Sequence, residues 1–214
     1  MLIELLSNTV VKAYKRFQIL GAWRFRILWF AHRLFLPFTG LHKQWEFILG
    51  YLPSLSKKSR GKLRILEVGC TPSLLIYELD KRGYETHGVD LRPYQERLPP
   101  RIKFYQGELS KINLPEKYFS YVVAMSVIQH AGMGQYGEIK NKDGDKIMIR
   151  EIARVLEEKG QLLLTTPNEK ICRYISYPLK GYNYFSLKEL VHEFFEIQEY
   201  AERHGNICVA LIKK

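Results

Sequence analysis

The chain has 214 residues and a formal net charge of +11, from 33 Lys and Arg residues against 22 Asp and Glu residues. This length suffices for one domain with a sizeable core, and a hydrophobic content of 46% excludes a disordered chain. The charge is concentrated in residues 1–62, which hold eleven basic and two acidic residues, while residues 63–214 are close to neutral. This distribution argues against a uniformly basic nucleic-acid binder and for a near-neutral domain behind a cationic segment.

The chain lacks the signatures of a disulfide scaffold, a metal site or a membrane span. Its three cysteines, at positions 70, 172 and 208, show no CxxC spacing, and the histidines show no HExxH spacing, so we expect no metal. The most apolar stretch, residues 19–41, is interrupted by Arg24, Arg26 and Arg33, which excludes a transmembrane helix. Without a secretory signal, we expect a cytoplasmic protein, and membrane association stays open.

Residues 1–55 form a basic, aromatic extension that we expect to be helical, ahead of a domain over residues 56–214. One helical stripe carries the large apolar side chains Trp23, Ile27, Phe30 and Leu34, and Pro37, Gly40 and Pro53 punctuate the end of the region. Three roles stay open for this extension. It could be a lid over the domain, a peripheral membrane contact through residues 1–40, or, less favoured, a nucleic-acid contact.

From Leu63 onward, short apolar runs alternate with helical patterns. The pattern predicts helices over residues 71–82, 145–158 and 186–195, the first capped by Thr71 and Gly83 and the last opened by a capping box of Ser186 and Glu189. It predicts strands over residues 63–68, 86–90, 102–106, 119–126, 160–166, 195–200 and 207–212. The predicted fold is α/β: a seven-stranded, mostly parallel sheet with helices on both faces and an antiparallel strand from the C-terminal hairpin.

Ligands of such sheets bind at the carboxyl ends of the strands, so the residues that follow each strand are the candidates for a site. The first strand ends in Glu67-Val68-Gly69-Cys70, where glycine allows a tight turn and the next helix favours a negative group. The turn is not GxGxxG, because Thr71 and Ser73 stand where further glycines are expected. A dinucleotide is therefore less favoured.

Five sequence elements in order resemble class I S-adenosylmethionine-dependent methyltransferases of the type 11-like group. They are Ile65-Leu-Glu-Val-Gly-Cys70, His87-Gly-Val-Asp90, Gln106-Gly-Glu108-Leu109, the apolar strand 119–126, and Arg154-Val-Leu-Glu-Glu-Lys-Gly160-Gln-Leu-Leu-Leu-Thr-Thr-Pro167. The resemblance covers about residues 62–213. It implies S-adenosylmethionine as cofactor and methyl transfer as the activity.

The resemblance also assigns cofactor-binding positions. It places Glu67, Gly69 and Cys70 at the methionine part of the cofactor, Asp90 and Leu91 at the ribose, Glu108 and Leu109 near the adenine, and Ser126 and Val127 beside the sulfonium. A carboxylate such as that of Asp90 accepts hydrogen bonds from both ribose hydroxyls. The family more often has Asp at position 108, so the glutamate there is a departure.

The reaction implied is an in-line displacement, for which the protein aligns the acceptor and removes a proton. His130, just after the fourth strand, is the candidate base, with a structural cap as its alternative. The glycine-rich segment 131–145 is a substrate loop or a plain surface loop, with Tyr136 and Glu138 as its candidate substrate residues. The segment 173–185, with Tyr182 and Tyr184, forms an acceptor wall or lid, or merely packs aromatic rings.

The expected acceptor follows from motifs that the sequence lacks. The Asn/Asp-Pro-Pro-Tyr/Phe motif of nucleic-acid amino methylation does not follow the fourth strand, and no cysteine nucleophile stands there. We therefore expect a hydroxyl-type acceptor on a small molecule, lipid or glycan. The alternatives are a non-catalytic methyltransferase-like binding subunit, an RNA methyltransferase that uses the basic extension and, more weakly, a NAD-dependent oxidoreductase. The sequence leaves the oligomeric state open.

Overall fold

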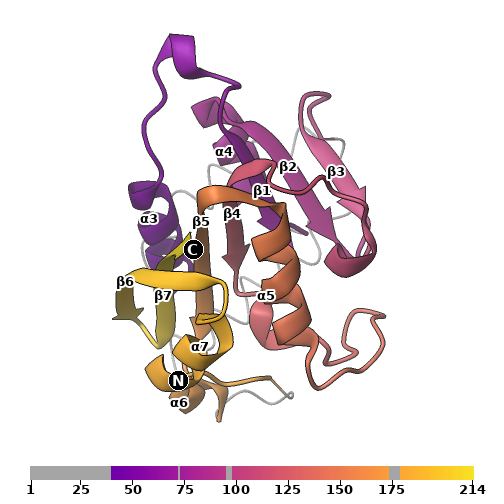
Figure 1. The fold of residues 1–214 in the computed structure, drawn as a ribbon, viewed down its shortest axis with the longest axis vertical. Helices are drawn as coiled ribbons and strands as arrows, with labels where there is room; N and C mark the ends of the chain where they lie inside the picture. Colours follow the sequence, from indigo (N-terminus) through magenta and orange to yellow (C-terminus); the bar gives the residue numbers. More distant parts are fainter. Residues whose placement is uncertain (1–39, 72, 95–97, 174–178) are drawn as a thin grey trace, which may run out of the picture.

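A computed structural model describes residues 40–71, 73–94, 98–173 and 179–214 of the chain (Figure 1). The three interpretations of the N-terminal extension fall on residues 1–39, outside the described residues, and they stay predictions. Two aromatic residues of the segment 173–185, Tyr174 and Tyr177, also fall outside the described part of the chain.

A single seven-stranded sheet organises the domain. Its strands are β1 (Arg64–Val68), β2 (Glu85–Asp90), β3 (Lys103–Gln106), β4 (Phe119–Met125), β5 (Leu156–Pro167), β6 (Phe195–Arg203) and β7 (Asn206–Lys213). The order across the sheet is β3-β2-β1-β4-β5-β7-β6, and β7 runs antiparallel between β5 and β6. This arrangement confirms the predicted fold, including the antiparallel strand near one edge.

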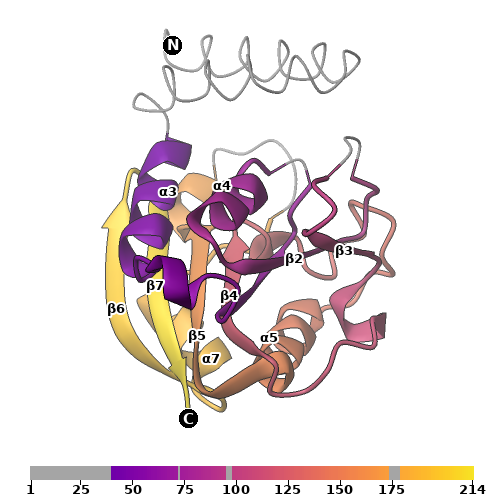
Figure 2. The ribbon, with the colours of Figure 1, turned by 90° about the horizontal axis from the view of Figure 1, so that it is seen from above.

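Helices cover both faces of the sheet. Figure 2 shows α3 (Gly40–Tyr51) and α4 (Leu75–Arg82) on one face, and α5 (Gly144–Val155) and α7 (Tyr184–Val191) on the other. Each pair buries apolar side chains against the strands, as Leu75 and Leu79 of α4 and Ile149 and Ile152 of α5 do. Short turns complete the fold: η2 (Lys57–Ser59), η3 (Leu109–Lys111), η4 (Ile128–His130) and α6 (Glu169–Cys172).

Helix α3 belongs to the same core as the sheet, although it lies within the predicted extension. Trp45, Ile48 and Leu52 are buried among side chains of β1, α4 and β7. Two polar contacts fasten its C-terminal end: the Arg82 Nη1 donates to the Leu49 carbonyl at 2.9 Å, and the Tyr84 hydroxyl donates to the Pro53 carbonyl at 2.6 Å. Gly40 therefore begins a packed helix. The domain boundary at residue 55 itself stays a prediction.

Two predicted helix starts are wrong by about one turn. Helix α4 begins at Leu75 with Leu74 at the N-cap position, the Thr71 Oγ1 caps nothing, and the Ser73 Oγ accepts the Leu75 N–H. Helix α7 begins at Tyr184 with Asn183 as its N-cap, and Ser186 is the third residue of a reciprocal capping box rather than the cap. At α7 a neighbouring polar side chain, Asn183, takes the cap position that was predicted for Ser186.

The helix predicted over residues 145–158 ends earlier, at Val155, and β5 begins at Leu156. Leu156 is fully buried as a strand residue paired with Phe119. Ile149 is fully buried on α5, while Ile147 is half-buried. The described residues between β2 and β3 form no helix.

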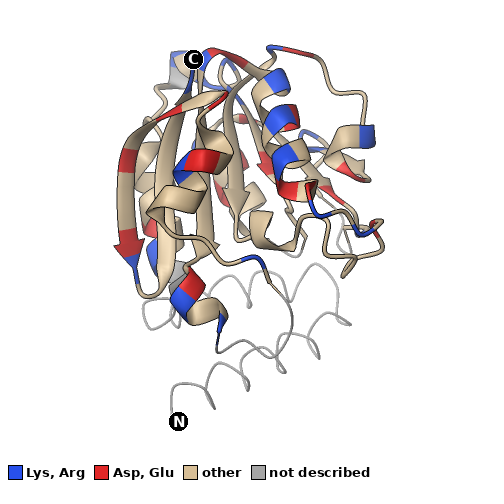
Figure 3. Cartoon of the chain, turned by 60° about the horizontal axis from the view of Figure 1, so that its bottom comes forward, with Lys and Arg blue, Asp and Glu red and all other residues tan. Residues whose placement is uncertain are grey.

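Charge is unevenly distributed over the described elements. Figure 3 marks basic residues in blue along α5, which carries Lys146, Arg150 and Arg154, and acidic residues in red along β6. Within the ranges that the structure describes, none of the helices has both the length and the apolar character needed to cross a membrane.

Candidate functional site

The carboxyl end of β1 carries a buried acid. Glu67 is 1% exposed, and its Oε2 has no hydrogen-bond partner. Burial raises the pKa of Glu67 to about 8, against the lowering effect of a hydrogen bond from Ser73. Buried polar atoms are normally satisfied, so an orphaned carboxylate oxygen at a strand end is typical of a group that awaits a ligand.

The turn after β1 brings the backbone close to the end of β4. Gly69 has φ +72°, and a Cβ there would lie 2.6 Å from the Val127 Cγ2, so this position requires glycine. The next residue, Cys70, is fully buried, and a Cβ at Gly88 would lie 2.7 Å from its Sγ. Burial raises the pKa of the Cys70 thiol. The Cys70 side chain therefore packs beneath the turn, and only its backbone is placed to face a ligand.

Asp90, the last residue of β2, holds the neighbouring loops with both carboxylate oxygens. Its Oδ2 accepts the Thr71 N–H at 2.8 Å, and its Oδ1 accepts the Arg92 N–H at 2.8 Å and the Arg92 Nε at 3.3 Å. The side chain is buried. Each carboxylate oxygen has about two acceptor positions, so the Oδ2 keeps capacity for a further donor.

The loop after β3 reaches the same edge of the sheet. The Gly107 N–H donates to the Asp90 carbonyl at 2.8 Å. Glu108 pairs with Lys111 at 2.7 Å and accepts the Ser110 hydroxyl at 2.8 Å, and the Lys111 bond holds the pKa of Glu108 below its usual range. Leu109 is buried in the core and Leu91 is half-buried. The carboxylate of Glu108 is thus already engaged, and its contact with the adenine stays a prediction.

A residue that sequence reasoning missed, Gln44 of α3, joins the ends of β4 and β5. Its Oε1 accepts the Ser126 hydroxyl at 2.8 Å and the Thr165 hydroxyl at 2.5 Å. Ser126 has φ +50°, an uncommon conformation for a residue other than glycine. Its N–H also donates to the Thr165 carbonyl at 2.9 Å. These bonds hold Ser126 and Val127 in a fixed position beside Gly69. No local pattern around residue 44 indicates this role.

His130 ends the turn η4 that follows β4. Its Nδ1 lies 2.6 Å from the Gln135 Oε1, which can only accept, so the Nδ1 carries the proton and the Nε2 is the basic nitrogen. The Tyr136 ring meets the imidazole edge-on, with ring centroids 5.3 Å apart. Burial, followed by the charge of Arg92, lowers the pKa of His130, against the raising effects of Gln135 and Glu138. The imidazole is therefore neutral near pH 7.

The other candidate substrate residues have structural contacts of their own. Glu138 accepts the N–H groups of three residues of its own loop: Gly134, Gln135 and Tyr136. Tyr182 is buried and donates its hydroxyl to the Asp145 Oδ2 at 2.9 Å. Tyr184, at the start of α7, meets the rings of Phe185 and Tyr200 edge-on. Contact of Tyr136, Glu138, Tyr182 and Tyr184 with a substrate stays a prediction.

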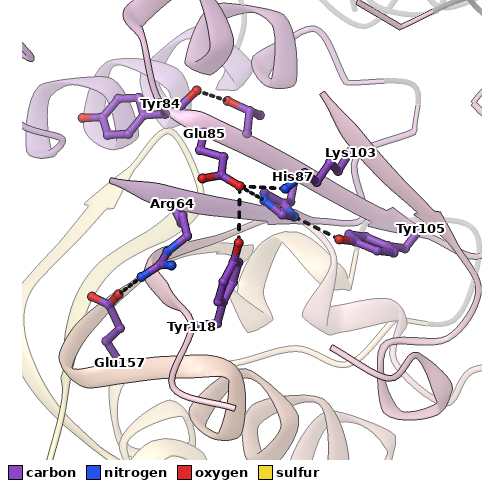
Figure 4. Close-up of polar contacts among 9 residues, drawn as sticks. Arg64, Tyr84, Glu85, His87, Lys103, Tyr105, Tyr118 and Glu157 are labelled. Carbon is purple, nitrogen blue, oxygen red and sulfur yellow. Dashed lines mark hydrogen bonds and ion pairs between the residues drawn. The ribbon is translucent and has the colours of Figure 1, made fainter. Parts of the chain in front are cut away.

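A second polar cluster lies at the opposite ends of the strands, around His87 (Figure 4). The His87 Nε2 lies 3.2 Å from the Glu85 Oε1, which also accepts from Lys103 at 2.8 Å and from Tyr118 at 3.3 Å. The His87 Nδ1 faces the Tyr105 hydroxyl at 3.2 Å. Burial lowers the pKa of His87. Because this cluster surrounds the beginnings of the strands, we interpret it as structural.

We expect the buried His87 to weaken the fold in acid. The folded state holds His87 neutral, while the unfolded chain protonates it below about pH 6.5. Its contribution to stability is therefore present above that pH and is lost as the pH falls toward the folded-state pKa, by at most about 1.4 kcal/mol per pH unit. Urea unfolding of the wild type and His87→Gln at pH 7.5 and 5.0 measures this effect.

The difference between the two proteins is the useful quantity, because contributions from other groups, such as Glu67, cancel in it. The free-energy advantage of the wild type over His87→Gln should shrink from pH 7.5 to 5.0. An advantage that stays constant or grows on acidification would contradict this interpretation.

Together the strand ends carry polar groups that suit a ligand with a cationic group and hydroxyl groups, and binding of such a ligand stays a prediction. Glu67 offers an unpartnered buried carboxylate oxygen, Asp90 offers further acceptor capacity, and Gly69 leaves the backbone bare beside them. Among the residues with a described position, no group of three or more His, Cys, Asp or Glu side chains is arranged to hold a metal ion.

Comparisons with known proteins relate this chain to methyltransferases. The sequence pattern of the family described as "Methyltransferase domain" matches residues 66–164, which span β1 to β5. A curated relative, the magnesium-protoporphyrin O-methyltransferase of Rhodobacter capsulatus, is 28% identical over 92 residues. That match covers 39% of this chain and 40% of the relative, so the chain aligns with less than half of that protein's length.

Solved structures share the fold at low sequence identity. A TehB-like SAM-dependent methyltransferase from Corynebacterium glutamicum superposes with a TM-score of 0.58 and 20% identity, over 80% of this chain and 86% of that one. The 1,6-didemethyltoxoflavin-N1-methyltransferase of Burkholderia thailandensis, solved with bound S-adenosylhomocysteine, gives a TM-score of 0.58 at 14% identity, over 73% of each chain. At these identities the likeness demonstrates the fold.

Proposed function

We propose that this chain, which carries a class I S-adenosylmethionine-dependent methyltransferase domain, transfers a methyl group to a hydroxyl-type acceptor on a small molecule, lipid or glycan. The observation that carries the proposal is the position of His130 directly after β4, with its Nδ1 2.6 Å from the Gln135 Oε1 and its pKa lowered by burial. A hydroxyl nucleophile needs a base that is neutral at the working pH, and a lowered imidazole pKa supplies one. That the curated relative is named an O-methyltransferase supports an oxygen atom as the acceptor.

The residues at the strand ends fit the cofactor. Glu67 would hold its amino-acid part, the Asp90 carboxylate would accept from its ribose, and the Gly69 turn would leave room for its approach. When bound, S-adenosylmethionine supplies a methyl group already activated by a sulfonium. The protein's own task is then to bind, orient and deprotonate the acceptor.

The residues that follow β4 would position the candidate base. Ser126 is held by hydrogen bonds through Gln44 to Thr165, and this fixes the backbone that leads into η4. Gln135 keeps the proton on the Nδ1 of His130, which leaves the Nε2 to accept a proton from the acceptor hydroxyl. The lowered pKa keeps this nitrogen unprotonated near neutral pH.

The experiment that tests the function is a transfer assay with methyl-labelled S-adenosylmethionine against lipid, glycan, small-molecule and RNA fractions. We expect label in a lipid, glycan or small-molecule fraction. Label confined to RNA would overturn the acceptor class. Calorimetric titrations with S-adenosylhomocysteine and with NAD accompany the assay. Binding of S-adenosylhomocysteine without any transfer would favour a non-catalytic binding subunit, and binding of NAD alone would exclude methyl transfer.

The buried Glu67 predicts that cofactor affinity depends on pH. The carboxyl with a pKa of about 8 is protonated in the free protein near pH 7, whereas a bound ammonium group favours the carboxylate. Binding therefore releases a proton, and the affinity for S-adenosylhomocysteine should rise up to about tenfold per pH unit between pH 6 and 8. Calorimetry in buffers of different ionisation enthalpy measures both the affinity and the released proton.

The variant Glu67→Gln keeps the shape of the side chain and removes the titration. We expect a flat affinity profile and no proton release for it. Glu116→Gln, at an exposed position between β3 and β4, is the matched control and should behave as the wild type does. A wild-type affinity that stays constant from pH 6 to 8 would contradict the assignment of Glu67.

A further inference from the structure

Arg92 is a cation at the candidate site that the function described so far does not use. It follows β2 by two residues, and its side chain is 40% exposed. Its Nε and its backbone N–H both donate to the Asp90 Oδ1, and its Nη2 donates to the Thr71 carbonyl. The guanidinium is thus anchored in a fixed orientation between the turn after β1 and the end of β2.

The other face of this guanidinium carries Tyr136. The Arg92 Cζ lies 4.7 Å from the centroid of the Tyr136 ring, a cation–π distance. The same ring meets the His130 imidazole edge-on at 5.3 Å. A continuous series of contacts therefore runs from Asp90 through Arg92 and Tyr136 to His130, and it joins the cofactor side of the site to the candidate base.

The loop that carries Tyr136 is built to hold it in place. The Glu138 carboxylate accepts the N–H groups of Gly134, Gln135 and Tyr136. The base of the loop is closely packed, since a Cβ on Gly144 would lie 2.6 Å from the Gly132 nitrogen. A loop with its backbone groups satisfied in this way presents Tyr136 at a defined position.

We propose that Arg92 is a positioning residue. While Arg92 is hydrogen-bonded to Asp90, its contact with Tyr136 holds the glycine-rich loop and the His130 imidazole in place. The inference deepens the proposed function and rests on it for the role of His130 as base. The groups facing the imidazole include Gln135 and Tyr136 of its own loop, Glu138, and Arg92 from the end of β2. Arg92 lowers the pKa of His130 and Glu138 raises it.

The test is the titration of the His130 imidazole, followed by NMR with ¹⁵N-labelled histidine and assigned with His130→Gln. In Arg92→Gln, we expect the pKa of His130 to rise, because a nearby positive charge is removed and the Tyr136 ring loses its contact with Arg92. Tyr136→Leu should also raise it, while Tyr136→Phe, which keeps the ring, should preserve the wild-type value. In the double variant with Arg92→Gln and Tyr136→Leu, the two shifts should not add.

A matched Arg–Asp pair elsewhere in the fold provides the control. Arg101 donates through its Nε and Nη2 to Asp80 of α4, and neither residue contacts His130. Arg101→Gln should leave the His130 titration unchanged. In the transfer assay, Arg92→Gln should lower kcat between about tenfold and 100-fold, and Arg92→Lys should recover only part of that loss, because an ammonium lacks the planar stack.

The failure of this inference is distinguishable from failure of the proposed function. A His130 titration that is the same in Arg92→Gln and the wild type would overturn the positioning role, whatever methyl-transfer activity the enzyme shows. If the titration shifts as expected but His130→Ala retains full activity, the contacts are as inferred, and it is the role of His130 as base that is wrong.

Discussion

Asp90→Ala is expected to weaken the binding of S-adenosylhomocysteine by at least about 100-fold. The variant removes the acceptor for the Thr71 and Arg92 N–H groups, so the turn after β1 loses its anchor together with the carboxylate that would meet the ribose. A hydrogen bond to a charged group contributes about 1.5–3 kcal/mol. The loss of two hydrogen bonds to the Asp90 carboxylate therefore corresponds to a factor of about 100 or more in affinity. Isothermal titration calorimetry measures the affinity directly.

Two further variants separate binding from folding. Asp90→Asn keeps one carbonyl acceptor for the Thr71 N–H and should show an intermediate affinity. Asp80 lies on α4, away from the site. Asp80→Asn breaks its ion pair with Arg101 and should bind S-adenosylhomocysteine as the wild type does. Circular dichroism confirms that each variant is folded. If folded Asp90→Ala bound the ligand as tightly as the wild type, the site would have to lie elsewhere.

The second large effect is expected at His130. His130→Ala should lower kcat by a factor of about 10² to 10⁴, the usual contribution of a general base, while the affinity for S-adenosylhomocysteine changes little. In the wild type, kcat/KM should fall as the pH drops through the lowered pKa of His130, because the protonated imidazole cannot accept a proton. Initial rates across a pH series with the identified acceptor measure both quantities.

His192→Ala is the matched control, because His192 lies exposed at the end of α7, with its Nδ1 at the Glu189 carbonyl. It should leave kcat and the pH profile unchanged. A kcat of His130→Ala within about threefold of the wild type would show that the acceptor needs no base from this residue. The search for a base would then turn to the other side chains of the glycine-rich loop.

Much of the fold follows from local sequence. The seven strands and their order of appearance were predictable, because apolar runs of four to eight residues bounded by turn residues are buried strands in almost any α/β context. The rule that ligands meet parallel sheets at their carboxyl ends directs attention to Glu67 and Asp90 at the ends of β1 and β2, and the family resemblance assigns their cofactor roles, which stay predictions.

Helix starts were harder to predict, because several polar side chains near a helix start compete for the same role. Thr71, Ser73 and Asn183 are all good caps by residue type, yet only Asn183 caps a helix, and the backbone of Thr71 is held by Asp90, which is 19 positions away in the chain. A cap pattern read locally cannot include such a partner.

The sequence by itself determined the class of this protein: a parallel sheet with acids at its strand ends and the motif order of a methyltransferase domain. Only the tertiary structure decided which side chains meet around those ends. Gln44 reaches Thr165 across 121 positions, and Arg92 reaches Tyr136 across 44. The physical reason is that burial patterns depend on each residue's immediate neighbours, whereas these contacts exist only because the sheet places β2, β1, β4 and β5 side by side.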